Sequence, residues 1–292
     1  MPSRRPVVPP LALVVAAVVS VQFGGALAAT LVPHIGAAGS VTLRLLFATA
    51  ILTAVARPRL RGHSGRAWLT VVGFGAALAL MNLAFYASLA HLPIGVAVTI
   101  EFLGPLTLAT VLSRRARDLA AVVAAGFGVV LISRALSVPV AELDWTGLGL
   151  AALAGACWAA YIIASGRTGR LFPQLDGLAL AMGVALLLVL PFGLPTVGTW
   201  TGVDIAKGLG IAVLSSVLPY SFELAALRHL SANVFGILLS LEPAVAAVAG
   251  LLVLHQRLDA TQLVGMALVV LASALVMGAG HQRHPDPAAS GG

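Results

Sequence analysis

The sequence predicts an all-α polytopic membrane protein with ten transmembrane helices in two inverted five-helix repeats. Of its 292 residues, 60% are hydrophobic and only 9% are charged, whereas a soluble domain carries roughly a quarter charged residues. Apolar runs of about 20 residues recur along the chain, the length that an α-helix needs to cross the hydrocarbon core. A pattern of residues from the first half also returns in the second half. These three observations justify the fold class.

Allowing about 17–25 apolar residues per span gives ten predicted helices. They are expected at approximately 10–32, 37–56, 67–90, 93–112, 118–135, 146–166, 176–194, 204–226, 230–253 and 259–279. Helices are required because backbone polar groups in hydrocarbon must bond within their own segment. Residues 1–9 are expected to form a cytoplasmic segment, for which a cleavable signal peptide is the less favoured alternative. Residues 280–292 are expected to be a disordered cytoplasmic tail.

The basic residues predict the orientation, because cytoplasmic loops carry an excess of Lys and Arg. With a cytoplasmic N-terminus, thirteen of the 17 basic residues lie on the inner side. The outer side holds Arg134, Lys207 and Arg257, and Arg44 lies within a span. Both termini are therefore expected in the cytoplasm, with the chain in the cell (inner) membrane. The basic residues lie in short gaps between apolar runs, so nucleic acid is not an expected partner; the lipid bilayer is.

The repeat is carried by the stretch around His91 and its echo 138 residues later, where His229, Leu230 and Pro243 fall on His91, Leu92 and Pro105. The predicted repeats are 10–136 and 146–279. Each holds five spans, an odd number, so the second enters the membrane inverted. Inverted repeats are typical of secondary transporters, whose substrate sites lie near the midplane. The alternative is a chance match between two segments rich in Ala, Leu and Val.

Four charged residues lie within predicted spans: Arg44, Glu101, Glu223 and Glu242. Each costs about 3 kcal/mol at a helix centre, so such residues usually face a partner or a wet cavity. Arg44 and Glu101 lie at similar depth, where they could form a structural ion pair or hold a substrate. Glu223 has the alternative of extending toward the membrane surface near Arg228.

Polar and aromatic side chains complete the predicted site. Asn82 and Tyr86 share the level of Arg44 and Glu101, and this set suits a zwitterion, with Glu101 for an ammonium and Arg44 for a carboxylate. The alternative is a buried polar cluster that only fixes helix packing. The predicted substrate-binding residues are Arg44, Asn82, Tyr86, Glu101, Trp158, Tyr220 and Ser221, the proton-coupling residues Glu242 and Glu223, and the helix-kinking residues Pro105, Pro219 and Pro243.

Signatures of enzymes are absent from the sequence. It has no Gly-rich phosphate loop, no HExxH and no Gly-x-Ser-x-Gly elbow. The histidines show no metal-ligand spacing, and the lone Cys157 excludes an intramolecular disulfide. We therefore expect no enzyme activity, no cofactor and no bound metal.

Several motifs, taken together and in order, resemble one known family. They are Gly39-Ser40-Val41-Thr42-Leu43-Arg44, Met81-Asn82 with Phe85-Tyr86, Glu101-Phe102-Leu103-Gly104-Pro105-Leu106, Ser113-Arg114-Arg115, Gly155-Ala156-Cys157-Trp158-Ala159, Leu218-Pro219-Tyr220-Ser221 with Glu223, and Leu241-Glu242-Pro243-Ala244. From about Leu11 to Met277 the chain resembles the drug/metabolite transporter superfamily with its two EamA-type repeats, and within it the threonine/homoserine exporters of the RhtA type.

The resemblance implies export of small amino acids or related metabolites, driven by the proton gradient. One departure is His255-Gln256, which replaces the Gly-Glu that family members usually carry before the last helix. The alternatives are a drug or metabolite carrier for another substrate class and a membrane scaffold that transports nothing. A homodimer is left open.

The two best-placed carboxylates have different expected roles. Glu242 has no cation at its level in its own half, so it is the hypothesised proton carrier. Glu101 is the hypothesised ammonium ligand, because Arg44 at its depth would keep it ionised.

Overall fold

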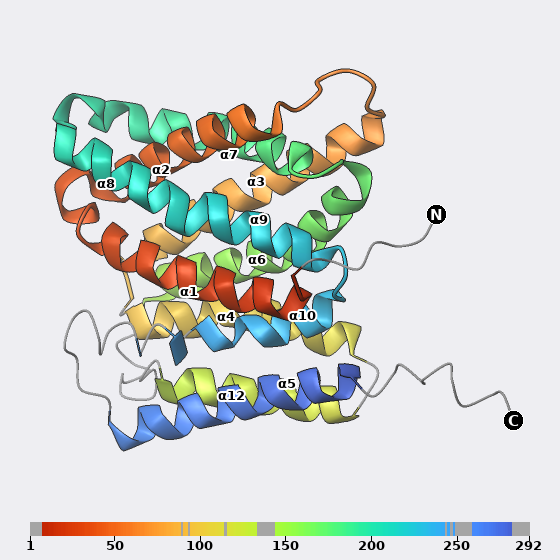
Figure 1. Cartoon of the computed structure of the whole chain (residues 1–292). Coiled ribbons are helices and arrows are strands. Elements are labelled where there is room, and N and C mark those ends of the chain that lie inside the picture. Colours follow the sequence, from red (N-terminus) through yellow and green to blue (C-terminus); the bar gives the residue numbers. More distant parts are fainter. Residues whose placement is uncertain are drawn as a thin grey trace, which may run out of the picture.

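The computed structural model describes residues 8–88, 90–92, 94–113, 116–132, 144–242, 244–245, 248 and 259–281, and every regular element in these ranges is helical (Figure 1). The first half contains α1 (Pro10–Ala29), α2 (Val32–Ala56), α3 (Gly65–Ser88), α4 (Ile94–Leu112) and α5 (Ala116–Ile132). The second half contains α6 (Trp145–Leu171), α7 (Asp176–Gly193), η3 (Leu194–Thr199), α8 (Gly202–Ala212), η4 (Val213–Val217), α9 (Leu218–Leu227), α10 (Ala232–Leu239) and α12 (Ala260–His281).

Length and composition allow several of these helices to span a membrane. Five stretches are long and apolar enough to cross a bilayer, namely Val32–Ala56, Gly65–Ser88, Trp145–Leu171, Asp176–Thr199 and Gly202–Leu227. Shorter apolar helices occur at Pro10–Gly25, Val96–Leu112 and Ala260–Ala272. Large apolar side chains such as Val123 and Phe127 are 66% and 65% exposed, as expected where lipid rather than water surrounds the protein. The prediction of an all-α membrane protein is confirmed.

The helix limits differ from the predicted ones at two instructive places. α2 spans Val32–Ala56, but the non-helical dihedrals of Gly36 (φ 74°, ψ 170°) divide it into a short first turn and a main helix that starts near the predicted residue 37. Only glycine adopts such a φ readily. The predicted helix 204–226 is α8, η4 and α9 in succession, with a π-helical turn directly before the turn that carries Pro219. Pro243, His255-Gln256, most of the predicted junction at 137–145, and residues 1–7 and 282–292 lie outside the described residues.

The two halves of the chain interleave. α3 packs on α6 and α7, α2 on α7 and α8, and α1 on α9, so the first three helices pack mainly against the second half. α4 packs on α6 and α10, and α5 lies along α12 at one side of the bundle, beyond α4 and α10 (Figure 1). The largest core cluster is centred where these helices cross, around Phe74, Tyr161, Met182 and Phe235.

Glycines allow the closest helix crossings. A Cβ atom on Gly104 of α4 would lie 1.9 Å from the backbone oxygen of Gly155 in α6, so the two backbones touch there. α5 and α12 cross reciprocally, because a Cβ on Gly128 or on Gly265 would lie 2.7 Å from the other's backbone oxygen. Small residues at helix crossings are typical of membrane proteins, where packing replaces the hydrophobic effect as the source of helix association.

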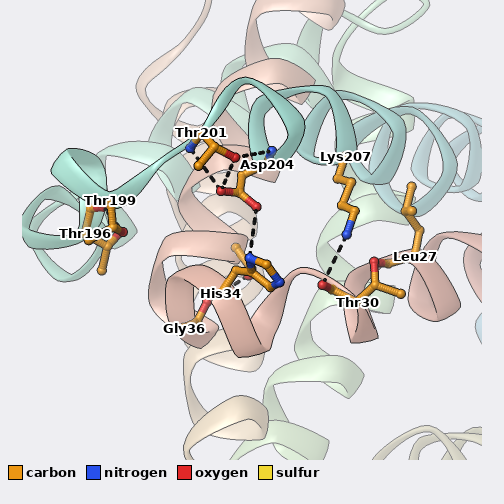
Figure 2. A network of polar contacts seen from close by, with 10 residues as sticks. Leu27, Thr30, His34, Gly36, Thr196, Thr199, Thr201, Asp204 and Lys207 are labelled. Carbon is orange, nitrogen blue, oxygen red and sulfur yellow. Dashed lines mark hydrogen bonds and ion pairs between the residues drawn. The ribbon is translucent and has the colours of Figure 1, made fainter.

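Polar contacts join the ends of helices that are distant in sequence. Figure 2 shows one such network, in which Asp204 of α8 forms a capping box with Thr201 and faces His34 of α2 at 3.9 Å. In the same network, Lys207 Nζ donates to the Thr30 carbonyl oxygen at 3.4 Å. His91, in the turn before α4, pairs with Asp144 at 3.0 Å. Asp144 also caps the start of α6 by accepting hydrogen bonds from the amides of Thr146 and Gly147.

Candidate functional site

The cationic part of the site is Arg44, which α2 carries into the bundle. Its side chain is buried, and its Nη2 donates to the Asn82 Oδ1 of α3. Asn82 is itself held by a hydrogen bond from its Nδ2 to the Leu78 carbonyl oxygen, at 2.7 Å. The Arg44 Nε finds no protein partner. Among the described residues, no carboxylate lies within ion-pair distance of Arg44.

The ion pair between Arg44 and Glu101 that their equal depth allowed is therefore not formed. The reason is the helix arrangement: α2 packs on α7 and α8, whereas α4 packs on α6 and α10. Two residues at the same depth meet only when their helices are neighbours. Arg44 is therefore not placed to keep Glu101 ionised.

The anionic part contains Glu223, which is buried at 6% exposure and accepts a hydrogen bond from the Tyr161 hydroxyl of α6. The alternative in which Glu223 extends toward Arg228 is wrong. The Arg228 guanidinium instead donates to the carbonyl oxygens of Gly169, Phe172 and Gln174, at the end of α6 and in the turn after it. Glu223 thus points into the bundle.

Two further carboxylates lie within the bundle. Glu242 is within electrostatic range of both Glu223 and Glu101, and Glu101 and Glu242 are each partly accessible. The Gly104–Gly155 crossing brings α4 onto α6, so the ring of Phe102, next to Glu101, meets Trp158 edge-on at 4.8 Å between centroids. In the part of the chain that the structure describes, no three His, Cys, Asp or Glu side chains come together to hold a metal ion.

Two tyrosines lie between the cation and the acids. The rings of Tyr161 and Tyr220 are 5.6 Å apart, and Tyr161 also packs on Phe74 at 5.5 Å. The Tyr220 hydroxyl lies within interaction distance of Arg44, Asn82 and Glu223. Tyr161 is a candidate residue of the second half that the predicted substrate-binding set leaves out. Its signal was in the sequence, however, because it follows Trp158 by three residues and therefore shares its helix face.

The other predicted residues are more peripheral to these contacts. Tyr86 packs partly buried against the main core cluster and meets Phe85 at 6.0 Å. The Ser221 hydroxyl donates to the Val217 carbonyl oxygen of its own helix. Pro105 lies inside α4, where its carbonyl oxygen faces Gly236 of α10, and Pro219 follows the π-helical turn.

A helical membrane bundle that holds a buried cation on one side and three acids on the other defines a class of protein. Such intramembrane charges cost free energy and mark pathways for charged solutes or ions. The fold and the site together are those of a membrane transporter.

Comparison with known proteins supports that class. The sequence profile of the EamA-like transporter family matches residues 145–278. The chain is 38% identical over 274 residues to the threonine/homoserine exporter RhtA of Escherichia coli strain K12, which covers 92% of each chain. It is 37% identical to RhtA of Salmonella typhimurium strain LT2 over the same share. Protein PecM of Dickeya dadantii is 31% identical over 167 residues, 55% of this chain and 54% of that one.

One crystal structure of another protein superposes with a TM-score of 0.75, over 92% of this chain and 99% of that chain. Its identity to this chain is 16%, so the likeness shows the fold alone. The chain belongs to the EamA-like transporter family. The prediction of a transporter and not an enzyme, made from the motifs, is confirmed by that membership.

Proposed function

We propose that this protein exports small amino acids of the threonine or homoserine kind across the inner membrane in exchange for protons. The extended similarity to the RhtA exporters supports the substrate class. The observation that carries the proposal is the separation of the buried charges: Arg44 has no acid partner and Glu223 bonds a neutral phenol. A free amino acid is a zwitterion, so its carboxylate suits Arg44 and its ammonium suits the acids.

In this proposal Arg44 binds the substrate carboxylate through the guanidinium nitrogens that Asn82 does not occupy. Asn82 fixes the orientation of the guanidinium, and Tyr220 lies beside both groups. Glu101 is the proposed ammonium ligand, because it is partly accessible and its helix is held against the turn of α6 that precedes Trp158. An indole face so close can also attract the ammonium.

Glu242 and Glu223 are the proposed proton carriers. Glu242 is within electrostatic range of both Glu223 and Glu101, and among the described residues none of the three forms an ion pair with a cation. Such a group is not all ionised together, so it holds exchangeable protons. An ammonium that arrives at Glu101 adds positive charge and favours release of a proton from Glu242. This coupling would let protons moving inward expel substrate outward.

The proposed frame is ten spans in two inverted repeats with both termini in the cytoplasm. Helix packing supports the repeat. In the proposed repeat α1 corresponds to α6, α2 to α7, α3 to α8 with α9, α4 to α10, and α5 to α12. The contact of α3 with α6 then corresponds to that of α1 with α8 and α9, and the contact of α2 with α8 corresponds to that of α3 with α7. The pairs α2–α7, α4–α10 and α5–α12 then join equivalent helices, and the reciprocal Gly128–Gly265 crossing belongs to the last pair.

The test uses the purified protein in proteoliposomes loaded with labelled threonine. We expect efflux to increase severalfold when the external solution is made more acidic, and to acidify a lumen that holds a pH-sensitive dye. Threonine amide and N-acetylthreonine, which lack the carboxylate and the ammonium respectively, should compete poorly. Equal competition by either analogue would contradict the zwitterion site, and efflux that ignores the pH gradient would contradict proton coupling.

A further inference from the structure

The face of α6 that points into the helical bundle carries a line of hydroxyl groups. It continues from Tyr161 toward the end of the helix that holds Arg170. Ser165 and Thr168 follow Tyr161 by four and seven residues, so the three side chains lie on one face. Both are fully buried, at 0% exposure. At 1.5 Å per residue, Thr168 lies about 10 Å along the helix axis from Tyr161.

Neither hydroxyl has a hydrogen-bond partner among the residues that the structure describes. Buried polar groups are almost always paired, and among the described residues only the hydroxyls of Thr42, Thr49 and Ser216 share this lack of a partner. A Ser or Thr inside a helix usually bonds a carbonyl oxygen in its preceding turn. Other residues of this chain do so: the Ser88 hydroxyl donates to the Phe85 carbonyl oxygen at 2.7 Å and Thr110 to that of Leu106 at 2.8 Å. Ser165 and Thr168 leave their hydroxyl groups available for another ligand.

The two ends of this line meet groups that can supply or take protons. At one end the Tyr161 hydroxyl bonds Glu223, which belongs to the acid group with Glu242. At the other end the Thr168 methyl contacts the first turn of α7, where a Cβ on Gly177 would lie 2.2 Å away and Asp176 is the adjacent residue. The line therefore runs from the acid group to the junction of α6 and α7.

The charged and titratable groups around this line come from α6 itself and from its neighbours α3, α4, α7 and α9. α6 contributes the exposed Arg167 and Arg170, and α3 contributes Arg66 and Tyr86. α4 contributes Glu101, α7 contributes Asp176, and α9 contributes Tyr220, Glu223 and Arg228. Arg228 donates its hydrogen bonds to carbonyl oxygens at the end of α6, so it does not neutralise Glu223. Arg228, Arg167 and Arg170 thus lie near the far end of the line, and none of them forms an ion pair with Glu223 among the described contacts.

We propose that Ser165 and Thr168 bind water and form, with Tyr161, the route by which Glu223 exchanges protons with the Arg170 end of α6. Ser165 and Thr168 lie about 4.5 Å apart along the helix axis, a separation that one water can bridge. Each hydroxyl or water accepts one proton and passes one on, so each passage moves one proton between the solution and the Glu223 carboxylate. The inference rests on the proposed proton-coupled export.

The test separates proton movement from substrate binding in the same proteoliposomes. The double variant Ser165→Ala/Thr168→Val removes both hydroxyls and keeps the side-chain shapes. We expect gradient-driven threonine efflux and the accompanying proton flux to fall at least about tenfold, because the route has lost its water ligands. Threonine exchange at equal pH, which needs no net proton movement, should stay within about twofold of wild type. Thr168→Ser, which keeps the hydroxyl, should retain the coupled flux.

Ser88→Ala and Thr110→Val are the matched controls, because their hydroxyls bond only their own helices. Both should leave gradient-driven efflux and proton flux unchanged. Wild-type coupled flux in the double variant would overturn the hydroxyl route while leaving the proposed function intact. Equal loss of exchange and of coupled flux would overturn it as well, since the hydroxyls would then serve packing. An absence of substrate-linked proton flux in the wild type would instead overturn the proposed coupling.

Discussion

Arg44 and Glu223 carry opposite charges into the same helical bundle, and each forms a hydrogen bond with a neutral side chain. The Arg44 guanidinium donates to an amide, and the Glu223 carboxylate accepts from a phenol. A protein that only had to hide these charges would join them to each other, and would leave no charge free. A neutral partner fixes the orientation of a charged group without cancelling its charge. Both groups are therefore held ready for a charged ligand, Arg44 for the substrate carboxylate and Glu223 for a proton.

The largest expected effect follows from removing the cation. Arg44→Gln should lower threonine transport at least about 30-fold, since losing one partner of a desolvated charge contact costs about 2–5 kcal/mol. The thermal midpoint should stay equal or rise, because an unneutralised buried charge is removed. Efflux and thermal unfolding of the purified variant check both. Arg59→Gln, at an exposed position, is the control, and an equal loss there would show that the effect is not specific to the site.

The next largest effects are expected at two acids, Glu101 and Glu242, which have different proposed roles. Glu101→Gln should abolish threonine binding and exchange, because the ammonium loses its anionic ligand. Glu242→Gln should keep binding and exchange but lose uphill, gradient-driven efflux, because a proton carrier is gone. Exchange and gradient-driven efflux measured side by side distinguish the two variants. If Glu242→Gln still concentrates substrate against its gradient, this division is wrong.

A smaller effect is expected from the crossing that positions Glu101. Gly104→Ala should destabilise the protein by about 1–3 kcal/mol, because its new methyl group meets the Gly155 backbone and forces α4 away from α6. Transport should fall in parallel. Gly73→Ala in α3 is the matched control: nothing lies within 4 Å of its added Cβ, so its thermal midpoint should stay equal or rise slightly. A Gly104→Ala variant as stable as wild type would contradict the backbone contact.

The smallest effect concerns a charge that does have an opposite partner. His91 and Asp144 are paired at 3.0 Å on an exposed surface. The hydrogen bond from His91 and those from the Thr146 and Gly147 backbone amides lower the pKa of the Asp144 carboxyl. A group with a lowered folded-state pKa stabilises the fold at neutral pH, and this stabilisation is lost as pH falls through that pKa.

Asp144→Asn should therefore lower the thermal midpoint slightly near pH 7, and the difference from wild type should shrink as the pH approaches the acidic range of a carboxyl. Threonine transport should be nearly unchanged. Thermal unfolding of both proteins across a pH series measures this. A difference that grows on acidification would show that the carboxylate form is not the stabilising one.

The helical membrane fold and the residues with buried charge could be predicted from the sequence, because both depend on local composition. An apolar run of span length has only the helix available in a bilayer, and a charge inside it is conspicuous. Their partners could not be predicted in the same way. Depth along a helix follows from counting residues, but the neighbour of a helix depends on tertiary packing. Arg44 and Glu101 share a depth on helices that do not pack together, and so the predicted pair is not formed.

The rotation of a helix about its own axis is a second property that cannot be found by counting residues along the sequence. Glu223 lies near the end of a span and near Arg228 in sequence, which allowed it to extend toward the surface. Its helix is instead turned so that Glu223 meets Tyr161 of α6, while Arg228 bonds the end of that helix. The contact of Asp204 with His34 was likewise not expected, since it joins α2 to α8 across the bundle.

The interleaving of the two halves has a consequence for how the protein is made. The ribosome delivers the first half before the second, and α1, α2 and α3 find their main packing partners only among helices that are synthesised later. Until α6, α7 and α9 enter the membrane, Arg44 and Asn82 must be shielded by each other, by lipid headgroups or by the insertion machinery. The first five helices therefore form no stable unit by themselves. Two separately encoded halves would restore the transporter only if both were inserted into the same membrane at the same time.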